Sequence, residues 1–219
     1  MTGTGWRLSP LGEAAITVTL GDRVDPVVHD RVLDLARRVR AAQWPGIRDV
    51  VPAYAAVSVF FDPEKTSHAR VSAALRTLQH SGAVPENSPL QTGREFHLAV
   101  RYDGPDLDEV ATRTGLSRAE VIARHAARTY RVYLLGFVPG FAYLGELDPA
   151  LALPRRVEPR QRVPAGAVAI AGEQTGIYPF PTPGGWHLIG TTGSRMFDPD
   201  RDPPALLAVG DRVRFEAVD

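Results

Sequence analysis

Apolar positions in the first eighty residues follow two spacings: every second residue, as in a half-buried strand, or every third or fourth, as on one face of a helix. In order, these spacings predict a strand at 13–20, a helix at 27–42, strands at 47–51 and 55–61, and a helix ending at 78. Residues 96–101 could supply one further strand. A strand–helix–strand–strand–helix order is typical of a small α+β sandwich of the ferredoxin-like type.

The pattern changes after a polar stretch at 80–92, whose prolines and glycine indicate a linker. We therefore predict a small α+β domain at 1–92 and a second domain at 93–219. Beyond the linker the spacing predicts helices at 107–114 and 117–128, then short strands at 132–137, 167–171, 186–191 and 212–217. Ser117 and Glu120 fit the capping box Ser-x-x-Glu at the start of the second helix. Short strands separated by long turn-rich segments are typical of a β-barrel or sandwich with long functional loops.

Composition narrows the classes of function. The 219 residues carry 25 basic and 25 acidic side chains, so the formal net charge is zero. Such a chain has no general electrostatic attraction to nucleic acid or to anionic membranes, and we predict neither as a partner. The absence of cysteine excludes disulfides, a thiolate nucleophile and zinc–cysteine sites. No apolar run reaches transmembrane length and the N-terminus does not resemble a signal peptide, so we expect a cytoplasmic protein.

One segment, residues 130–198, is dense in glycine, proline and arginine. Within it Gly140 stands beside Phe141, and Tyr143 follows closely. Glycine lets backbone amides approach a ligand and aromatic rings supply flat apolar walls, so these three residues could line an anion nest or a substrate pocket. The alternative is a tight barrel corner whose glycines only satisfy backbone geometry.

A basic cluster between prolines offers guanidinium groups that suit a carboxylate or a phosphate. Its members are Arg155, Arg156, Arg160 and Arg162. We select Arg155, Arg160 and Arg162 as candidate substrate- or phosphate-binding residues. The alternative for any one of them is a solvated loop or a protein interface, since long charged side chains are mostly exposed.

Three more candidates lie downstream. Gln174 can both donate and accept hydrogen bonds, so it could fix an amide group, and Thr175 beside it is a second binding candidate. His187 is the candidate general acid–base residue, because the ordinary pKa of histidine lies near neutrality. Its alternative role is that of a strand histidine that is merely hydrogen-bonded. The other histidines lack metal-ligand spacing, so we predict no metal site.

Several absences limit the chemistry of this chain alone. The sequence contains no Gly-x-x-x-x-Gly-Lys-Ser/Thr phosphate loop, no Gly-x-Ser-x-Gly elbow and no Gly-x-Gly-x-x-Gly after a strand. A nucleophile, a base and an orienting group cannot be assembled from it. We therefore expect the chain to supply binding groups and to have no activity by itself.

Three stretches resemble one known family. They are GFVPGFAYLGELDP at 136–149, PRRVEPRQRVPAGAVAIAGEQTGIYP at 154–179 and PGGWHLIG at 183–190. The family, of the carboxyltransferase subdomain C and D type, includes the B subunit of 5-oxoprolinase, allophanate hydrolase subunit 1 and the KipI-type inhibitors of a sporulation histidine kinase. The resemblance covers nearly the whole chain, and its motifs are long and specific.

The resemblance implies a cyclophilin-like β-barrel after a small α/β domain. It also implies a KipA-type partner (the C subunit of 5-oxoprolinase, or allophanate hydrolase subunit 2) and, in the oxoprolinase system, a third subunit. The expected reaction is ATP-driven opening of 5-oxoproline to glutamate, with ATP at a site shared with the partner. The alternatives are a component of an allophanate or urea-derived amide hydrolase, and a non-enzymatic inhibitor of a sensor histidine kinase.

Two positions depart from the family pattern. Glu173 stands where a second glycine is common. Thr191 stands where the family commonly has arginine, which removes a permanent cation from the expected site, and Arg195 a few residues later could substitute for it. These departures leave the substrate open among 5-oxoproline, allophanate and urea-derived amides.

Overall fold

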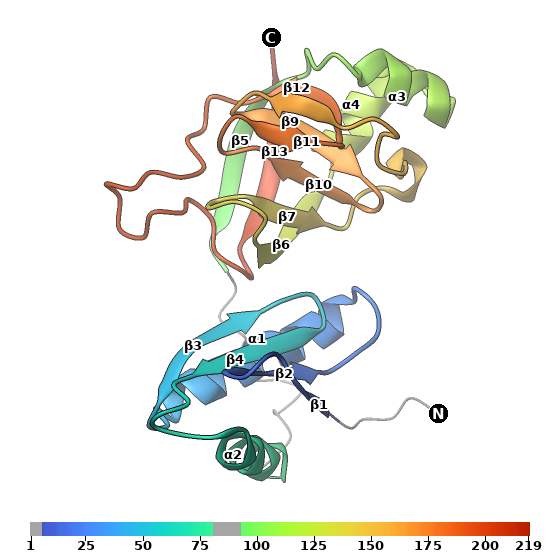
Figure 1. Ribbon diagram of the computed structural model, residues 1–219. Coiled ribbons are helices and arrows are strands. Elements are labelled where there is room, and N and C mark those ends of the chain that lie inside the picture. The colour runs from blue at the N-terminus through green and yellow to red at the C-terminus, as the bar shows by residue number, and fades with distance from the viewer. Residues whose placement is uncertain (1–5, 81–92) are drawn as a thin grey trace. The chain divides into compact units, whose positions relative to one another are not determined.

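The computed structural model describes residues 6–80 and 93–219 (Figure 1). Contacts divide the chain into two compact units, Met1–Gln91 and Thr92–Asp219, each with its own hydrophobic core. The predicted linker at 80–92 lies almost entirely outside the described residues.

The N-terminal unit is an α/β sandwich. Its antiparallel sheet has the strand order β1-β2-β4-β3, and helices α1 and α2 share one apolar core with the sheet (Figure 1). The elements are β1 (Arg7–Pro10), β2 (Ala15–Thr19), α1 (Pro26–Ala41), β3 (Ile47–Pro52), β4 (Ala56–Phe61) and α2 (His68–His80). From β2 onward this is the predicted strand–helix–strand–strand–helix order, and the α+β class is confirmed.

The edge strand β1 was not predicted. It forms a hairpin with β2, with Arg7 opposite Thr19. The further strand predicted at 96–101 is present as β5 (Glu95–Arg101), and it belongs to the C-terminal unit. The four residues of β1 end at Pro10 and make too short a run for a period of two to be visible.

The C-terminal unit is a closed β-barrel with the strand order β10-β7-β6-β13-β5-β12-β9 (Figure 1). Strands β5 and β13 pair in parallel, and the other neighbours pair antiparallel. The barrel strands are β5 (Glu95–Arg101), β6 (Thr129–Leu135), β7 (Ala142–Gly145), β9 (Ala167–Ala171), β10 (Gln174–Ile177), β12 (His187–Thr191) and β13 (Arg212–Val218). This barrel after a small α/β unit is the fold class that the resemblance implied.

The remaining elements lie outside the barrel wall. They are α3 (Leu107–Thr114), α4 (Arg118–Ala126), the 3-10 turn η1 (Pro149–Leu151), and a two-stranded ribbon of β8 (Arg160–Val163) and β11 (Thr182–Gly184). Helix α4 begins with the predicted capping box: Ser117 Oγ accepts from the N–H of Glu120, and the Glu120 carboxylate accepts from the N–H of Ser117. Strands of three or four residues, namely β7, β8, β10 and β11, escaped prediction because they are too short to show a period.

Strand β9 is buried on both faces, which explains its unbroken apolar sequence AVAIA. Val168 and Ile170 belong to the main core, to which every barrel strand contributes. The three alanines of β9 face the other way and pack in an outer core. The aromatic residues of that outer core are Phe141, Tyr178 and Trp186. The small alanine side chains leave room for these rings against the barrel wall.

A buried chain of hydrogen bonds ties α4 to the barrel. The Thr175 hydroxyl donates to the carbonyl of Ala169 (3.0 Å), so its oxygen accepts from Nε2–H of His125 (2.9 Å). Nδ1 of His125 is then unprotonated and accepts from the hydroxyl of Tyr102 (2.7 Å). Burial lowers the pKa of His125 to about 3, so the imidazole stays neutral at ordinary pH.

We predict that stability falls as pH is lowered from about 6.5 toward 3. In this window the unfolded chain protonates His125 and the folded chain does not, so each pH unit should remove up to about 1.4 kcal/mol of unfolding free energy. Urea unfolding of wild type and His125→Gln across the window measures the effect. The hydrogen bond to Glu216 raises the pKa of His97, which therefore also makes stability depend on pH. This contribution is the same in wild type and His125→Gln and does not affect the comparison. Equal slopes for the two proteins would contradict a buried neutral imidazole.

Candidate functional site

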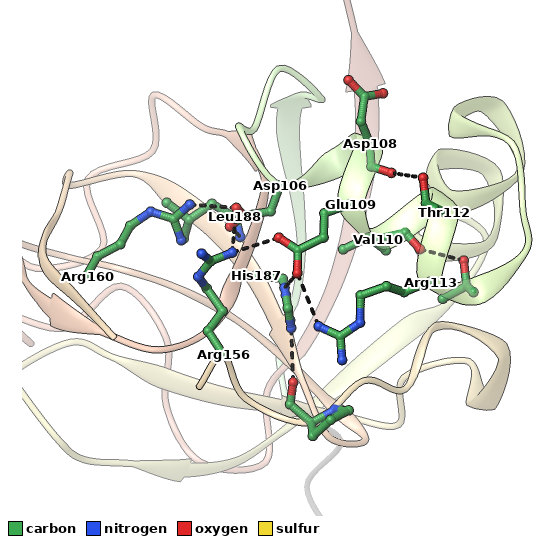
Figure 2. A network of polar contacts seen from close by, with 12 residues as sticks. Asp106, Asp108, Glu109, Val110, Thr112, Arg113, Arg156, Arg160, His187 and Leu188 are labelled. Carbon is green, nitrogen blue, oxygen red and sulfur yellow. Dashed lines mark hydrogen bonds and ion pairs between the residues drawn. The ribbon is translucent and has the colours of Figure 1, made fainter. Parts of the chain in front are cut away.

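The carboxylate of Asp106 joins three segments of the C-terminal unit (Figure 2). Its side chain is only 4% exposed. One oxygen accepts from Nη2 of Arg160 (2.5 Å) and Nη1 of Arg156 (3.1 Å), and the other accepts from the backbone N–H of Leu188 in β12 (2.7 Å). A buried carboxylate needs such partners, because an uncompensated charge is costly in the interior. We call Asp106, Arg156 and Arg160 the Asp106 clamp.

Glu109 extends the Asp106 clamp by one turn of α3. Its carboxylate accepts from Nη1 of Arg156 (2.8 Å) and from Nη1 of Arg113 (3.1 Å). Partial burial acts to raise the pKa of Glu109, but the hydrogen bonds from the two arginines outweigh it and hold that pKa below its usual value. Glu109 is therefore ionised at neutral pH and serves as an acceptor rather than as an acid.

His187, the candidate general acid–base residue, lies beneath Glu109 and has no exposed surface (Figure 2). Its Nε2 lies 3.0 Å from the carbonyl oxygen of Pro154, which can only accept, so Nε2 carries the proton. Its Nδ1 faces Oε1 of Glu109 at 3.8 Å, without a hydrogen bond. The structure thus favours the alternative role for His187, a strand histidine that holds a backbone carbonyl.

These contacts fix residues 154–160, which we call the clamped loop. Pro154 is held by His187, the N–H of Arg156 donates to the carbonyl of Gly185 (2.8 Å), and Arg160 reaches Asp106. Between these anchors the side chain of Val157 stands 99% exposed. The clamped loop is therefore anchored at both ends and open at its apex.

The four arginines of the basic cluster divide into two pairs. Arg156 and Arg160 have side chains that are only 26% exposed, and both are paired with carboxylates. Arg155 and Arg162 are exposed, and neither makes an ion pair or a side-chain hydrogen bond to residues 6–80 or 93–219. Of the predicted binding residues, Arg160 is thus neutralised within the chain, whereas Arg155 and Arg162 keep an uncompensated positive charge.

Four rings, those of Phe141, Tyr143, Tyr178 and Trp186, form what we call the aromatic cluster. Phe141 lies at its centre, with edge-to-face contacts to the other three at 4.9–5.6 Å between centroids. Burial raises the pKa of the Tyr143 phenol, and Arg155 opposes that rise. Burial also raises the pKa of the Tyr178 phenol, against a hydrogen bond from the backbone of Trp186 and the charge of Arg155. Both phenols therefore stay protonated.

The loop that carries Phe141 has two residues in the left-handed region. Gly140 has φ +80°, and a Cβ atom there would lie 2.7 Å from Cβ of Phe197, so both backbone and packing require glycine. Phe137 adopts φ +69°, which is uncommon for a bulky residue, and its side chain is 60% exposed. Its ring touches the aromatic cluster edge-on, 5.6 Å from Phe141. This loop therefore holds an aromatic ring in solvent.

The predicted pair Gln174 and Thr175 does not act as a unit. Thr175 is fully buried, and its hydroxyl is occupied by His125 and the carbonyl of Ala169. It supports the barrel and presents nothing to a ligand. Gln174 precedes it on β10 and is half-buried.

Sequence patterns missed the acidic members of the site, Asp106 and Glu109, and passed over Arg156. Asp106 directly precedes α3, where an aspartate usually caps the helix, yet its carboxylate makes no capping hydrogen bond. It reaches arginines 50 and 54 residues further on. The sequence shows only an aspartate at the N-cap position of α3. That its carboxylate does not cap the helix is seen only in the structure.

The arrangement suits binding more than bond-breaking. The exposed guanidinium groups of Arg155 and Arg162 can attract anions, whereas Phe141, Tyr178 and Trp186 are at most 5% exposed and pack as core. Within the ranges 6–80 and 93–219, no three His, Asp or Glu side chains are arranged to hold a metal ion. The hydroxyl–histidine pair of Thr175 and His125 is sealed in the barrel and cannot attack a substrate. None of the described helices combines the length and the apolar character needed to span a membrane.

The comparisons with known proteins agree with this architecture. The family model of the carboxyltransferase domain, subdomain C and D, matches residues 6–207. The chain belongs to this family. Among its relatives, the B subunit of 5-oxoprolinase from Escherichia coli O157:H7 is 41% identical over 209 residues, which make up 94% of this chain and 93% of that protein. The resemblance inferred from the three sequence motifs is thereby confirmed.

Two solved structures show the same fold within longer chains. The crystal structure of TTHA0988 superposes with a TM-score of 0.83 at 45% identity and covers 94% of this chain, which spans only 40% of that one. The K. lactis urea amidolyase gives a TM-score of 0.82 over 97% of this chain and 15% of its own. At 22% identity, the second likeness concerns the fold alone.

We predict that Asp106→Asn lowers the free energy of unfolding by about 3 kcal/mol, because it leaves two partly buried arginines without their shared carboxylate. Urea unfolding of the whole chain measures the change. Asp108→Asn is the matched control, since its carboxylate is 74% exposed and pairs with Arg118 at the surface. That variant should unfold like wild type. Equal losses in the two variants would show that the Asp106 clamp contributes no special stability.

Proposed function

We propose that the chain is one subunit of an ATP-dependent hydrolase that opens a small amide or lactam, with the opening of 5-oxoproline to glutamate as its reaction. The observation that carries this proposal is the 41% identity to the B subunit of a 5-oxoprolinase over 94% of the chain. The geometry of the site agrees with a binding role. It offers the exposed cations of Arg155 and Arg162, and no nucleophile is assembled in the described parts of the chain.

The chemistry explains why ATP is needed. A lactam carbonyl is a poor electrophile, and ATP would supply the phosphoryl group that activates its oxygen for the addition of water and the breaking of the C–N bond. The residues of this chain would bind and orient the substrate. Guanidinium and phenol donors directed at the carbonyl oxygen would stabilise the negative charge that develops there.

Only part of a nucleotide site can come from this chain. Arg155 and Arg162 carry free positive charge and could contact a phosphate, whereas Arg156 and Arg160 are already neutralised by Asp106 and Glu109. The sequence has no phosphate-binding glycine loop. We therefore propose that ATP binds at a site shared with a partner, which contributes the remaining contacts.

The expected partner is a KipA-type protein, the C subunit of 5-oxoprolinase, joined by a third oxoprolinase subunit. Two observations support a protein partner at this face. Phe137 and Val157 stand exposed on two loops that adjoin the aromatic cluster, and such apolar side chains are typical anchors of interfaces. In TTHA0988, the same fold makes up less than half of a longer chain. We propose that the partner completes the site from this side.

We predict that the chain alone hydrolyses no ATP, and that the complex co-expressed with its partner subunits does so when 5-oxoproline is added. Assays with 5-oxoproline, allophanate and urea separate the candidate substrates. Arg162→Ala should lower turnover several-fold by removing one free cation, while Arg214→Ala, an exposed arginine on β13, should not.

Each outcome of these assays is informative. If allophanate alone stimulates ATP hydrolysis, allophanate and not 5-oxoproline is the substrate. No stimulation by any of the three would overturn the enzyme proposal and favour the kinase-inhibitor alternative. Normal turnover in Arg162→Ala would show that Arg162 does not belong to the site. The proposed reaction would still stand.

A further inference from the structure

We infer that two hollows beside Trp44, in the N-terminal unit, form a docking groove for an acidic segment of another protein. An apolar side chain of that segment packs against the indole. We call this surface the Trp44 groove. Three observations carry the inference: two hollows that share one aromatic ring, a turn whose backbone holds that ring in place, and a local excess of positive charge.

The Trp44 groove consists of two adjoining hollows. One, of about 260 Å³, lies between the turn that follows α1 and the first residues of α2. The other, of about 380 Å³, lies between the end of α1 and β3. Trp44 and Ile47 line both hollows, and both side chains also pack against the core of the unit. A half-buried indole therefore borders two separate depressions in the surface.

The turn that carries Trp44 is held by its neighbours. The carbonyl of Trp44 accepts from the N–H of Ile47 (3.2 Å), and the carbonyl of Gly46 accepts from the N–H of Asp62 (2.7 Å). Gly46 has φ +85°, and a Cβ atom there would lie 3.0 Å from Cβ of Lys65, so glycine lets the turn pack closely on the segment before α2. A ring presented by a fixed backbone loses less entropy on binding.

Positive charge is concentrated around the Trp44 groove. Its lining carries four cations, Arg40, Arg48, Lys65 and Arg70, against a single acid, Asp49. Residues 6–80 carry ten basic and eight acidic side chains in all, so four of the ten cations gather at this one surface. A basic groove attracts acidic segments and repels basic ones, which gives the partner its sign of charge.

Two of these cations remain available to a partner. Arg70 is exposed, and its guanidinium forms no ion pair or hydrogen bond within the part of the chain that the structure describes. The Lys65 ammonium lies 3.7 Å from the carboxylate of Asp62, which Arg48 approaches more closely, at 3.2 Å. The Lys65 side chain is 70% exposed. Both cations line the smaller hollow together with Trp44, so a carboxylate beside the indole would meet them.

The shape of the Trp44 groove favours a polypeptide segment over a small molecule. A small-molecule site is usually a cleft of about 300–1,000 Å³ that encloses most of its ligand. Each hollow lies near or below the lower end of that range, and its rim carries exposed cations. Two small hollows that share one ring suit neighbouring side chains of one segment, and tryptophan and arginine are typical anchors of such contacts.

The test uses the whole chain and a fluorescently labelled random copolymer of glutamate and tyrosine, whose binding is followed by fluorescence anisotropy. Wild type should bind it, and salt at about 1 M should weaken binding because exposed charges are then screened. Lys65→Glu/Arg70→Glu should bind at least about tenfold more weakly, since it places like charges opposite the copolymer. Arg7→Glu/Arg76→Glu makes the same change of charge at exposed positions outside the groove and should bind like wild type.

The apolar part of the contact has its own test. Trp44→Ala should weaken binding of the copolymer about 10- to 30-fold, because the ring is lost. Poly-glutamate, which has no apolar side chains, should bind wild type more weakly than the copolymer does. Since Trp44 also packs against the core, circular dichroism checks that the variant is folded. If it is not, the exposed charge variants still decide the inference.

Three results would overturn the inference. They are no binding of the copolymer by wild type, equal binding by the two double variants, and equal affinity of wild type for poly-glutamate and the copolymer. Self-association of wild type in sedimentation that Lys65→Glu/Arg70→Glu abolishes would assign the groove to a second copy of this chain instead. The proposed function is tested separately by ATP hydrolysis, so either proposal can fail while the other stands.

Discussion

A single buried carboxylate, that of Asp106, organises the part of the barrel where the site lies. It accepts hydrogen bonds from two arginines and from the backbone of β12, and thereby joins the start of α3 to the clamped loop. A charge with so little exposure is tolerated only when its partners are in place, so the loop, the helix and the strand are energetically coupled. Together with His187, the interaction holds the backbone on either side of Arg155.

The clamp also sorts the arginines by role. Without it, Arg155, Arg156, Arg160 and Arg162 would form one undivided basic loop. With it, Arg156 and Arg160 are neutralised and only the outer two remain available to an anion. Buried His187 strengthens the same arrangement by holding the carbonyl that precedes Arg155. The chain therefore presents two exposed cations, Arg155 and Arg162, on or next to a loop whose backbone is held in place.

Sequence reasoning succeeded where the signal is local. The capping box at Ser117 and the fully apolar β9 depend on neighbours a few residues apart, and the long family motifs indicated the barrel. It failed where contacts span the chain. Neither the pairing of Asp106 with arginines about fifty residues away nor the burial of Thr175 leaves a trace in spacing. His187, the candidate acid–base residue, is shut off from solvent, and such burial is a property of the fold that spacing along the chain does not reveal.

We propose that another chain completes the face formed by Phe137, the clamped loop and the aromatic cluster. Amide hydrogen exchange, compared between the chain alone and the assembled complex, tests it most directly. Residues 136–141 and 154–160 should become protected in the complex, while the exposed edge of the N-terminal sheet at β1 should exchange as before. Protection confined to other regions, with these two loops unchanged, would contradict it.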